Sequence, residues 1–222
     1  MNKKPHFAII LSGCGRADGS EIHESVTAMM CVENIGATYQ CFAPDIEQTA
    51  VINHLDNTAM NEKRNVLIES ARIARGNILS LKEFDIEKYD GVIFPGGLGA
   101  ITNWCNFASK GTDCDINTNI HNIIRKCHEQ KIVIGAMCIA PVLIAMVLAD
   151  KHVHFTIGAG GEIAKNLEKL GAIHEEVGVT DVCIDRKNRV CSTPAYMLAT
   201  NILDVCQGAQ NLVGAMCQLI DG

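Results

Sequence analysis

Cys138 stands between a predicted strand and a predicted helix, a place where a thiol can become a nucleophile. The β-branched run at 132–134 is typical of a strand buried on both faces of a parallel sheet. Pro141 fits the first turn of a helix, because its missing N–H group would have no partner there. Free N–H groups at the start of a helix lower the pKa of a nearby thiol. We therefore expect an ionised Cys138 at a nucleophile elbow.

The other ten cysteines are interpreted as small buried hydrophobes, the commonest role of this residue type. Eleven is an odd number, and with no secretory signal it argues against a disulfide framework. No Cys-x-x-Cys or His-Glu-x-x-His segment occurs, so no metal site is predicted. Cys206 and Cys217 share a face of the last predicted helix and are expected in the core.

Glu24 is the candidate acid–base residue. A helix is predicted over 21–35, with Ser20 as its N-cap and Gly36 as its stop. Glu24 begins the apolar face of this helix, so it should turn toward the core where the first strand ends. His23 points about a quarter-turn away and is interpreted as a surface or loop residue.

Two glycine-rich loops follow predicted strands. The segment 12–19 resembles a dinucleotide-binding fingerprint, but Asp18 stands where a small residue is needed for close helix packing, so nicotinamide and flavin are disfavoured. The segment 95–100 includes Gly96 and Gly97, and its N–H groups suit an oxyanion hole. It lacks the Lys-Ser or Lys-Thr of a P-loop. An irregular active-site loop is expected from Asn103 to Thr118.

Strands alternating with helices predict an α/β fold: a three-layer sandwich with a mostly parallel, flavodoxin-like sheet and helices on both faces. One domain is expected over residues 1–222. Strands are predicted at 7–11, 38–42, 78–81, 89–94, 132–134, 179–184 and 190–192. Helices are predicted at 21–35, 61–75, 120–130, after Pro141, after Gly161 as far as 170, and at 197–219.

Composition narrows the possible partners. The net charge is −6 and no block of Lys or Arg is long, so nucleic acid is not an expected partner. The first predicted strand is too short for the apolar core of a signal peptide or for a membrane span. We therefore expect a cytoplasmic protein that does not bind membranes.

Several motifs resemble known families. The segment Met137 to Pro141, the Pro95-Gly96-Gly97 run and Glu24 resemble the class I glutamine amidotransferase-like superfamily, in its PfpI and deglycase branch. More narrowly, nearly the whole chain resembles the enhancing-lycopene-biosynthesis family, also described as glyoxalase ElbB or isoprenoid biosynthesis protein with amidotransferase-like domain. The segments that carry this second resemblance are 11–15, 18–24, 51–54, 64–69, 106–108 and 193–197.

The resemblance implies a glyoxalase-type lyase that needs neither metal nor other cofactor and converts glyoxal to glycolate, an activity also read as protein deglycation. Cys138 would add to the aldehyde of this small dicarbonyl substrate and Glu24 would move the proton. The N–H groups of Gly97 and Ile139 would hold the oxyanion. The superfamily also implies a homodimer. Possible pocket residues are Cys14, which could lie close to Cys138, together with His23, Gly96 and Asn103.

Two departures from the related enzymes matter. The deglycase branch carries a histidine about twenty places after its cysteine, where this chain has Gly158. Base catalysis then falls to Glu24, the favoured choice, or to a histidine from elsewhere such as His23 or His54. Amidotransferases need His-x-Glu after the last strand, and 193–196 lacks it, so glutamine hydrolysis is disfavoured. The alternative function is a redox-sensing or partner-binding protein with an oxidisable Cys138.

Overall fold

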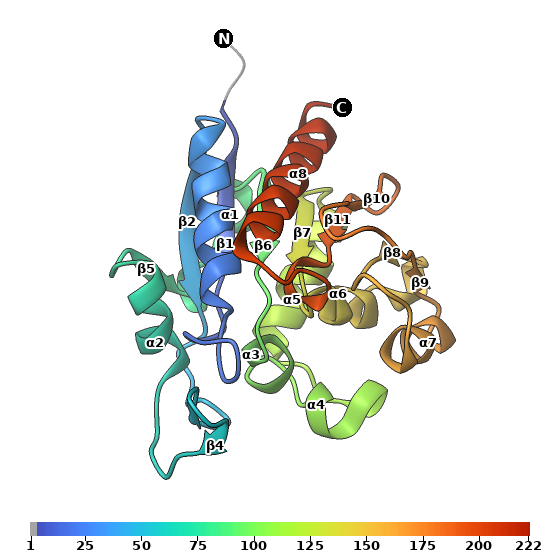
Figure 1. The fold of residues 1–222 in the computed structure, drawn as a ribbon. Helices are drawn as coiled ribbons and strands as arrows, with labels where there is room; N and C mark the ends of the chain where they lie inside the picture. The colour runs from blue at the N-terminus through green and yellow to red at the C-terminus, as the bar shows by residue number, and fades with distance from the viewer. Residues whose placement is uncertain (1–3) are drawn as a thin grey trace.

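A seven-stranded sheet organises the protein in the computed structural model, which describes residues 4–222 (Figure 1). The strand order is β10-β11-β7-β6-β1-β2-β5, and only β10 runs antiparallel to its neighbour. In chain order the strands are β1 His6–Ile10, β2 Thr38–Ala43, β5 Ile78–Ser80, β6 Gly91–Phe94, β7 Val133–Met137, β10 Cys183–Asp185 and β11 Val190–Thr193.

Helices cover both faces of the sheet. α1 (Ile22–Asn34) and α8 (Ile202–Asp221) pack side by side on the face turned to the viewer in Figure 1. α5 (Thr118–Glu129) lies behind the sheet against β7, next to α6 (Pro141–Val147). The predicted three-layer α/β fold with a mostly parallel sheet is thereby confirmed.

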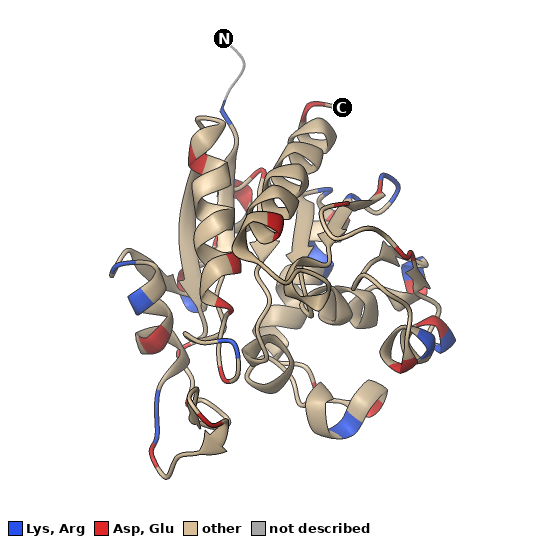
Figure 2. Ribbon diagram, viewed as in Figure 1, with Lys and Arg blue, Asp and Glu red and all other residues tan. Residues whose placement is uncertain are grey.

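Shorter elements lie between these strands and helices in the chain. They are the β3 (Ile52–Asn53) and β4 (Thr58–Ala59) hairpin, α2 (Val66–Ile73), α3 (Gly99–Thr102), α4 (Phe107–Lys110), the parallel pair β8 (His154–Phe155) and β9 (Ile173–His174), α7 (Glu162–Lys169), and 3-10 turns at Leu81–Glu83, Ile86–Lys88, Gly111–Asp113, Ala149–Lys151 and Ala195–Met197. Figure 2 shows charged residues gathered on α2, α7 and the loops, with few along α1 and α8. No helix among residues 4–222 is long and apolar enough to cross a bilayer.

The central strands form the core because parallel strands covered by helices are apolar on both faces. Ile9, Ile93 and Ile134, from β1, β6 and β7, are completely buried. Ile134 lies between Val92 of β6 and Val190 of β11 in the sheet register. These side chains form a continuous apolar layer across the central strands.

Capping explains several corrections to the predicted boundaries. Ser20 is not the cap of α1: its hydroxyl accepts the N–H of Ser12, while the Glu21 side chain accepts the N–H of Glu24 and starts the helix one residue later. The helix predicted at 61–75 begins at Val66, because the Asn65 side chain accepts the N–H of Ile68.

The carboxyl-terminal part differs in the same manner. The last helix starts at Ile202 rather than at 197, because Asn201 caps it and a 3-10 turn occupies Ala195–Met197. The strand predicted at 179–184 is only Cys183–Asp185, and the loop predicted at 103–118 contains α4. Cys206 and Cys217 are half-buried rather than in the core, as are Cys14 and Cys114.

The core assignment is tested by paired isoleucine substitutions. Ile134→Ala removes a fully buried side chain and should lower the free energy of unfolding by about 2–5 kcal/mol. Ile68→Ala, at a position 66% exposed on α2, should change it by less than about 0.5 kcal/mol. Urea unfolding monitored by circular dichroism measures both. Equal effects of the two substitutions would contradict this description of the core.

Candidate active site

Cys138 lies at the turn that follows β7, as the sequence predicts. Its backbone is left-handed, with φ of 61°, and its N–H group donates to the Thr193 carbonyl at 3.0 Å. Few side chains other than glycine adopt such a conformation, which costs about 1–3 kcal/mol and is found at functional sites. This turn directs the side chain toward a cavity that Cys138 lines, although the residue is only 8% exposed.

Two backbone N–H groups face the Cys138 sulfur, and they are those of Gly97 and Ile139. Ile139 follows Cys138 in the chain, whereas Gly97 comes from the loop after β6. β6 and β7 are neighbours and parallel, so their carboxyl ends deliver both groups to the same place. The predicted oxyanion donors are therefore brought together with the sulfur.

Glu24 reaches the same sulfur from the first turn of α1. Its side chain is completely buried and is hydrogen-bonded to the Cys138 side chain. Its Oε2 accepts the N–H of Gly96 at 2.9 Å, and its Oε1 accepts the N–H of Tyr196 at 3.3 Å. The carboxyl group is therefore fixed by chain segments after β6 and β11, in addition to its own helix.

Gly96 leaves the space in which the sulfur and the carboxyl group meet. A Cβ atom at this position would lie 2.5 Å from Glu24 Oε2 and 3.0 Å from Cys138 Sγ. Both separations are too short for non-bonded atoms, so a side chain here would push the two groups apart. The predicted pocket residue Gly96 thus contributes by having no side chain.

Burial dominates the electrostatics of the pair. It raises the pKa of Glu24 from 4.5 to about 7, and the nearby charge of Glu21 adds to the increase. Burial, followed by the charge of Glu24, raises the pKa of Cys138 well above its usual 9.0, although the N–H groups of Gly97 and Ile139 oppose this. The expected thiolate is therefore wrong for the resting protein, in which Cys138 is a neutral thiol beside an acid that titrates near neutrality.

The cavity beside Cys138 has a volume of about 610 Å³. Besides Cys138 and the oxyanion donors Gly97 and Ile139, it is lined by Arg16, Glu21, His23, Leu98, Ile101, Ile163, Tyr196 and Met197. Glu24 is not among the lining residues, but it contacts the side chain of Cys138, which is one of them. The arrangement permits proton exchange between the thiol and the acid while a ligand occupies the cavity.

Among the histidines considered from the sequence, His23 lines this cavity and His54 does not. His23 Nδ1 lies 2.7 Å from the Tyr196 hydroxyl, and the two rings are tilted against each other. His54 lies 3.6 Å from the Asp18 carboxylate, beside Gly15. His23, one of the possible pocket residues named from the sequence, therefore lies on the cavity wall.

Asn103 and Cys14 are not brought to the cavity. The Asn103 amide donates to the Ser12 and Asp18 carbonyls at 2.9 and 2.8 Å, and its oxygen accepts the N–H of Thr49 at 2.9 Å. Both ends of the Asn103 amide are engaged in joining three segments of the chain, so this residue has a structural role.

Cys14 lies in the 12–19 loop, where the charges of Glu69 and Arg72 act on it. Cys14, a possible pocket residue from the sequence, is therefore not among the residues that line the cavity at Cys138.

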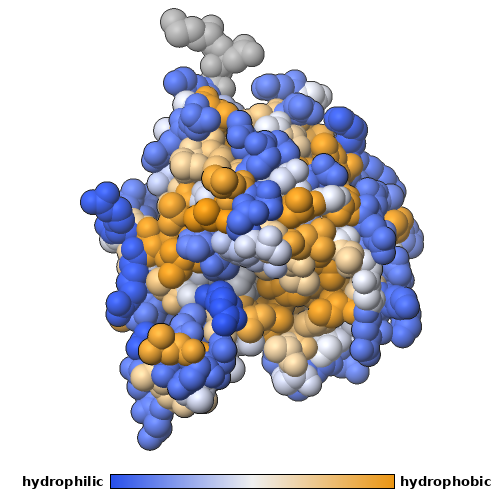
Figure 3. Space-filling view, viewed as in Figure 1, coloured by the Kyte–Doolittle hydropathy of each residue, from blue (hydrophilic) through white to orange (hydrophobic). Residues whose placement is uncertain are grey.

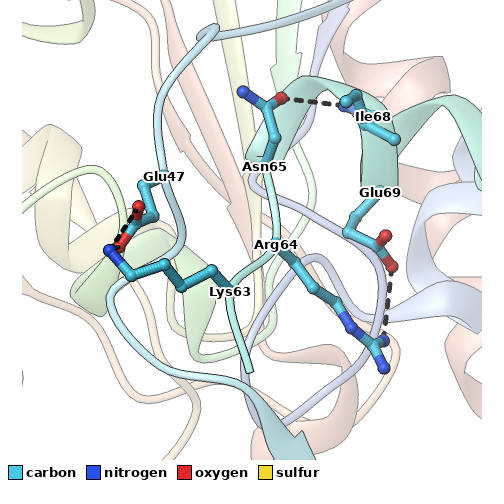
Figure 4. Close-up of a pocket in the computed structure, with 6 residues that line it drawn as sticks. All are labelled: Glu47, Lys63, Arg64, Asn65, Ile68 and Glu69. Carbon is cyan, nitrogen blue, oxygen red and sulfur yellow. Dashed lines mark hydrogen bonds and ion pairs between the residues drawn. The ribbon is translucent and has the colours of Figure 1, made fainter. Parts of the chain in front are cut away.

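A second, more polar pocket lies beside α2 (Figure 4). Its charges neutralise one another: Lys63 pairs with Glu47 at 3.0 Å and Arg64 with Glu69 at 3.5 Å. Asn65 is occupied in capping Ile68 at the start of the helix. No nucleophile lines this pocket, so we place the chemistry at Cys138. Among residues 4–222, no three His, Cys, Asp or Glu side chains converge as a metal site would require.

Sequence analysis missed two groups that the structure brings to the site. Tyr196 donates its N–H to Glu24 and its hydroxyl contacts His23. The sequence feature that could have identified Tyr196 is the 193–196 segment, which stands where amidotransferases carry His-x-Glu. Arg16 lies in the 12–19 loop, of which only the glycine pattern was interpreted from the sequence.

The raised pKa of Glu24 makes a prediction about stability. Between its pKa of 4.5 in the unfolded chain and about 7 in the fold, the folded protein keeps a proton that the unfolded chain has released. Stability is therefore full below pH 4.5 and falls as the pH rises to 7, by about 3 kcal/mol from this group. Glu24→Gln should abolish this part of the fall, whereas Glu33→Gln, exposed on the same helix, should not. Urea unfolding at pH 5 and 8 measures the difference, and identical pH dependence of the wild type and Glu24→Gln would contradict the assignment.

Curated relatives match nearly the whole chain. The Rattus norvegicus ES1 protein homolog, mitochondrial, is 41% identical, covering 98% of this chain and 83% of that protein. The Homo sapiens glutamine amidotransferase-like class 1 domain-containing protein 3, mitochondrial, is 40% identical, covering 96% of this chain and 81% of that protein. No protein-family model matches the chain. Both names place the relatives in mitochondria, so the expectation of a cytoplasmic protein, which rested on the short first strand, is contradicted.

Solved structures agree with these matches. An Ehrlichia chaffeensis isoprenoid biosynthesis protein with amidotransferase-like domain superposes with a TM-score of 0.89 at 33% identity, covering 96% of this chain and 99% of that chain. Drosophila melanogaster DJ-1beta shares the fold, with a TM-score of 0.54 at 16% identity, covering 99% of this chain and 97% of that chain. The chain therefore belongs to the ES1 family of proteins with a class I glutamine amidotransferase-like domain.

Proposed function

We propose that the protein is a cofactor-independent glyoxalase that converts 2-oxoaldehydes to 2-hydroxy acids, with Cys138 as nucleophile and Glu24 as the acid–base residue. The observation that carries this proposal is the hydrogen bond between the Cys138 thiol and a buried acid whose pKa is about 7. A general acid–base group works best when its pKa lies near the pH at which it acts. The narrower kinship with glyoxalases of the enhancing-lycopene-biosynthesis type, and any deglycase activity, belong to the same proposal.

The first step adds the Cys138 sulfur to the aldehyde carbon. Ionised Glu24 takes the thiol proton as the carbon–sulfur bond forms, and then returns it to the aldehyde oxygen to give a neutral hemithioacetal. The N–H groups of Gly97 and Ile139 stabilise the negative oxygen while it exists. Because the thiol loses its proton only during attack, the raised pKa of Cys138 is compatible with the reaction.

The second step moves hydrogen from one carbon to the next. Glu24, again ionised, removes the proton from the former aldehyde carbon to give an enediol and delivers it to the neighbouring carbon, while the hydroxyl proton of the hemithioacetal passes to the neighbouring oxygen. The first carbon is thereby oxidised to a thioester and the second is reduced to an alcohol, so no external oxidant or reductant is needed. Water then cleaves the thioester, releasing the 2-hydroxy acid and the Cys138 thiol.

The reaction is tested with methylglyoxal, by following lactate formation by NMR. Cys138→Ser and Glu24→Gln should each lower kcat/KM at least about 100-fold. Cys14→Ser, at a half-buried thiol outside the cavity, should leave it unchanged. In the wild type kcat/KM should rise with pH around a midpoint near 7, because Glu24 must be ionised to accept the thiol proton. Full turnover by Cys138→Ser would exclude the mechanism.

A redox-sensing role is the second candidate, because the same groups would hold an oxidised sulfur. The N–H groups of Gly97 and Ile139 and a protonated Glu24 could each donate to a sulfinate oxygen. The methylglyoxal assay separates the two functions when it is paired with mass spectrometry after mild peroxide treatment. No turnover together with selective oxidation of Cys138 would favour the sensor over the enzyme.

We also propose the homodimer that the superfamily resemblance implies. Ile22, Val26 and Met30 form an exposed apolar stripe along α1, and Figure 3 shows apolar side chains gathered on the α1–α8 face. An exposed apolar patch of this kind commonly marks a surface that another protein chain buries. Sedimentation equilibrium should give twice the monomer mass, and Val26→Lys should shift the protein toward monomer, while Ile68→Lys on α2 should not. A monomeric wild type at all concentrations would contradict this.

A further inference from the structure

The cavity at Cys138 is much larger than the reaction at its floor requires. Its volume of about 610 Å³ is typical of pockets that enclose drug-sized ligands, on the order of 300–1,000 Å³. Glyoxal and methylglyoxal, with four and five non-hydrogen atoms, would leave most of it to water. The residues that line the rest of the cavity therefore indicate which other groups the substrate carries.

The walls next to the nucleophile are aliphatic. Leu98 and Ile101 come from the segment after β6, Ile163 from α7, and Met197 from the turn after β11. Leu98 and Met197 are about two-fifths exposed, so their apolar surfaces are accessible to a ligand in the cavity. Such walls favour a ligand with a hydrocarbon body.

Arg16 supplies one positive charge to the same cavity. Its guanidinium donates to the Asn57 side-chain oxygen at 2.8 Å, and no carboxylate within the described part of the chain lies within 4.0 Å of it. Its carbonyl accepts the N–H of Leu98 at 2.8 Å, which ties the Arg16 backbone to the apolar wall. An arginine that has no acidic partner is free to pair with an anionic ligand.

Glu21 limits the charge that the cavity can accept. It lines the same space, although one of its carboxylate oxygens is engaged by the N–H of Glu24. A second negative group beside it favours a singly charged carboxylate over a doubly charged phosphate monoester. His23 and Tyr196 satisfy one another on this wall through their hydrogen bond.

We propose that the substrate is an amphiphilic aldehyde: a reactive carbonyl at one end, an aliphatic body of several carbons, and a carboxylate that pairs with Arg16. This inference deepens the proposed function by naming its substrate class, and the binding part of it stands on the cavity alone. The carbonyl is held at Cys138, the chain against Leu98, Ile101 and Ile163, and the carboxylate at the rim.

Binding is tested without turnover by protection of Cys138 from iodoacetamide, quantified by peptide mass spectrometry at alkaline pH. Octanoate should slow alkylation of Cys138 at least about tenfold more than acetate at equal concentration, and about threefold more than 1-octanol. Octyl phosphate should protect less than octanoate. Cys14, outside the cavity, is the internal control and should not be protected by any of them.

Arg16→Gln should reduce the protection by octanoate to that given by 1-octanol. Arg125 pairs with Asp150 away from the cavity, so Arg125→Gln should leave the protection of Cys138 by every compound unchanged. Equal protection by acetate and octanoate, or an undiminished octanoate effect in Arg16→Gln, would overturn the inference. Stronger protection by octyl phosphate would overturn the choice of a carboxylate.

Turnover separates this inference from the proposed function. With 2-oxooctanal in place of methylglyoxal, kcat/KM should rise at least about tenfold, and a terminal carboxylate on a chain of that length should raise it about threefold more, a gain lost in Arg16→Gln. Cys138-dependent turnover with no preference for chain length would contradict the inference and leave the glyoxalase proposal standing. Octanoate protection with no turnover of any aldehyde would contradict the glyoxalase and support the amphiphilic site.

Discussion

The burial of one carboxyl group next to one sulfur is the interaction on which the site depends. Glu24 is completely enclosed, and a carboxylate in such surroundings persists only with hydrogen bonds to satisfy it. The N–H groups of Gly96 and Tyr196 and the Cys138 thiol provide them. These hydrogen bonds stabilise the carboxylate inside the protein, whereas burial raises the pKa of Glu24 to about 7. A group poised in this way can both take and return a proton.

Parallel strands explain why the participants meet although they are far apart in the sequence. The segments after β1, β6, β7 and β11 supply Arg16, Gly97, Cys138 and Tyr196, and these four strands run in one direction in the same sheet. Their carboxyl ends therefore share one edge, where ligands bind in folds of this kind. Glu24 enters from α1, which packs across the front of the sheet beside α8 (Figure 1).

The sequence predicted what depends on local chemistry and periodicity. Apolar runs located the central strands, and the small residues around Cys138 located the elbow. Helix starts were less predictable where several cap residues compete, as at Ser20 and Glu21, because tertiary hydrogen bonds decide between them. The direction of side chains in the 12–19 loop was beyond the sequence, so Cys14 was placed in the cavity and Arg16 was overlooked.

The protonation state of Cys138 shows a further boundary of such reasoning. The partial charge at a helix start is a local feature, whereas burial is a property of the whole fold, and here burial outweighs the helix and raises the thiol pKa. The same comparison between local and global terms explains the role of Gly96, whose missing side chain matters only because Glu24 and Cys138 approach it from other elements.

The left-handed backbone at Cys138 has a consequence for how this fold can evolve. Glycine would relax that conformation and stabilise the turn, but it would delete the sulfur. Ala195, beside the residue whose N–H reaches Glu24, is also left-handed, with φ of 43°. The protein thus keeps strained backbone at two turns, after β7 and after β11. A stabilising substitution of Cys138 by glycine would remove the nucleophile.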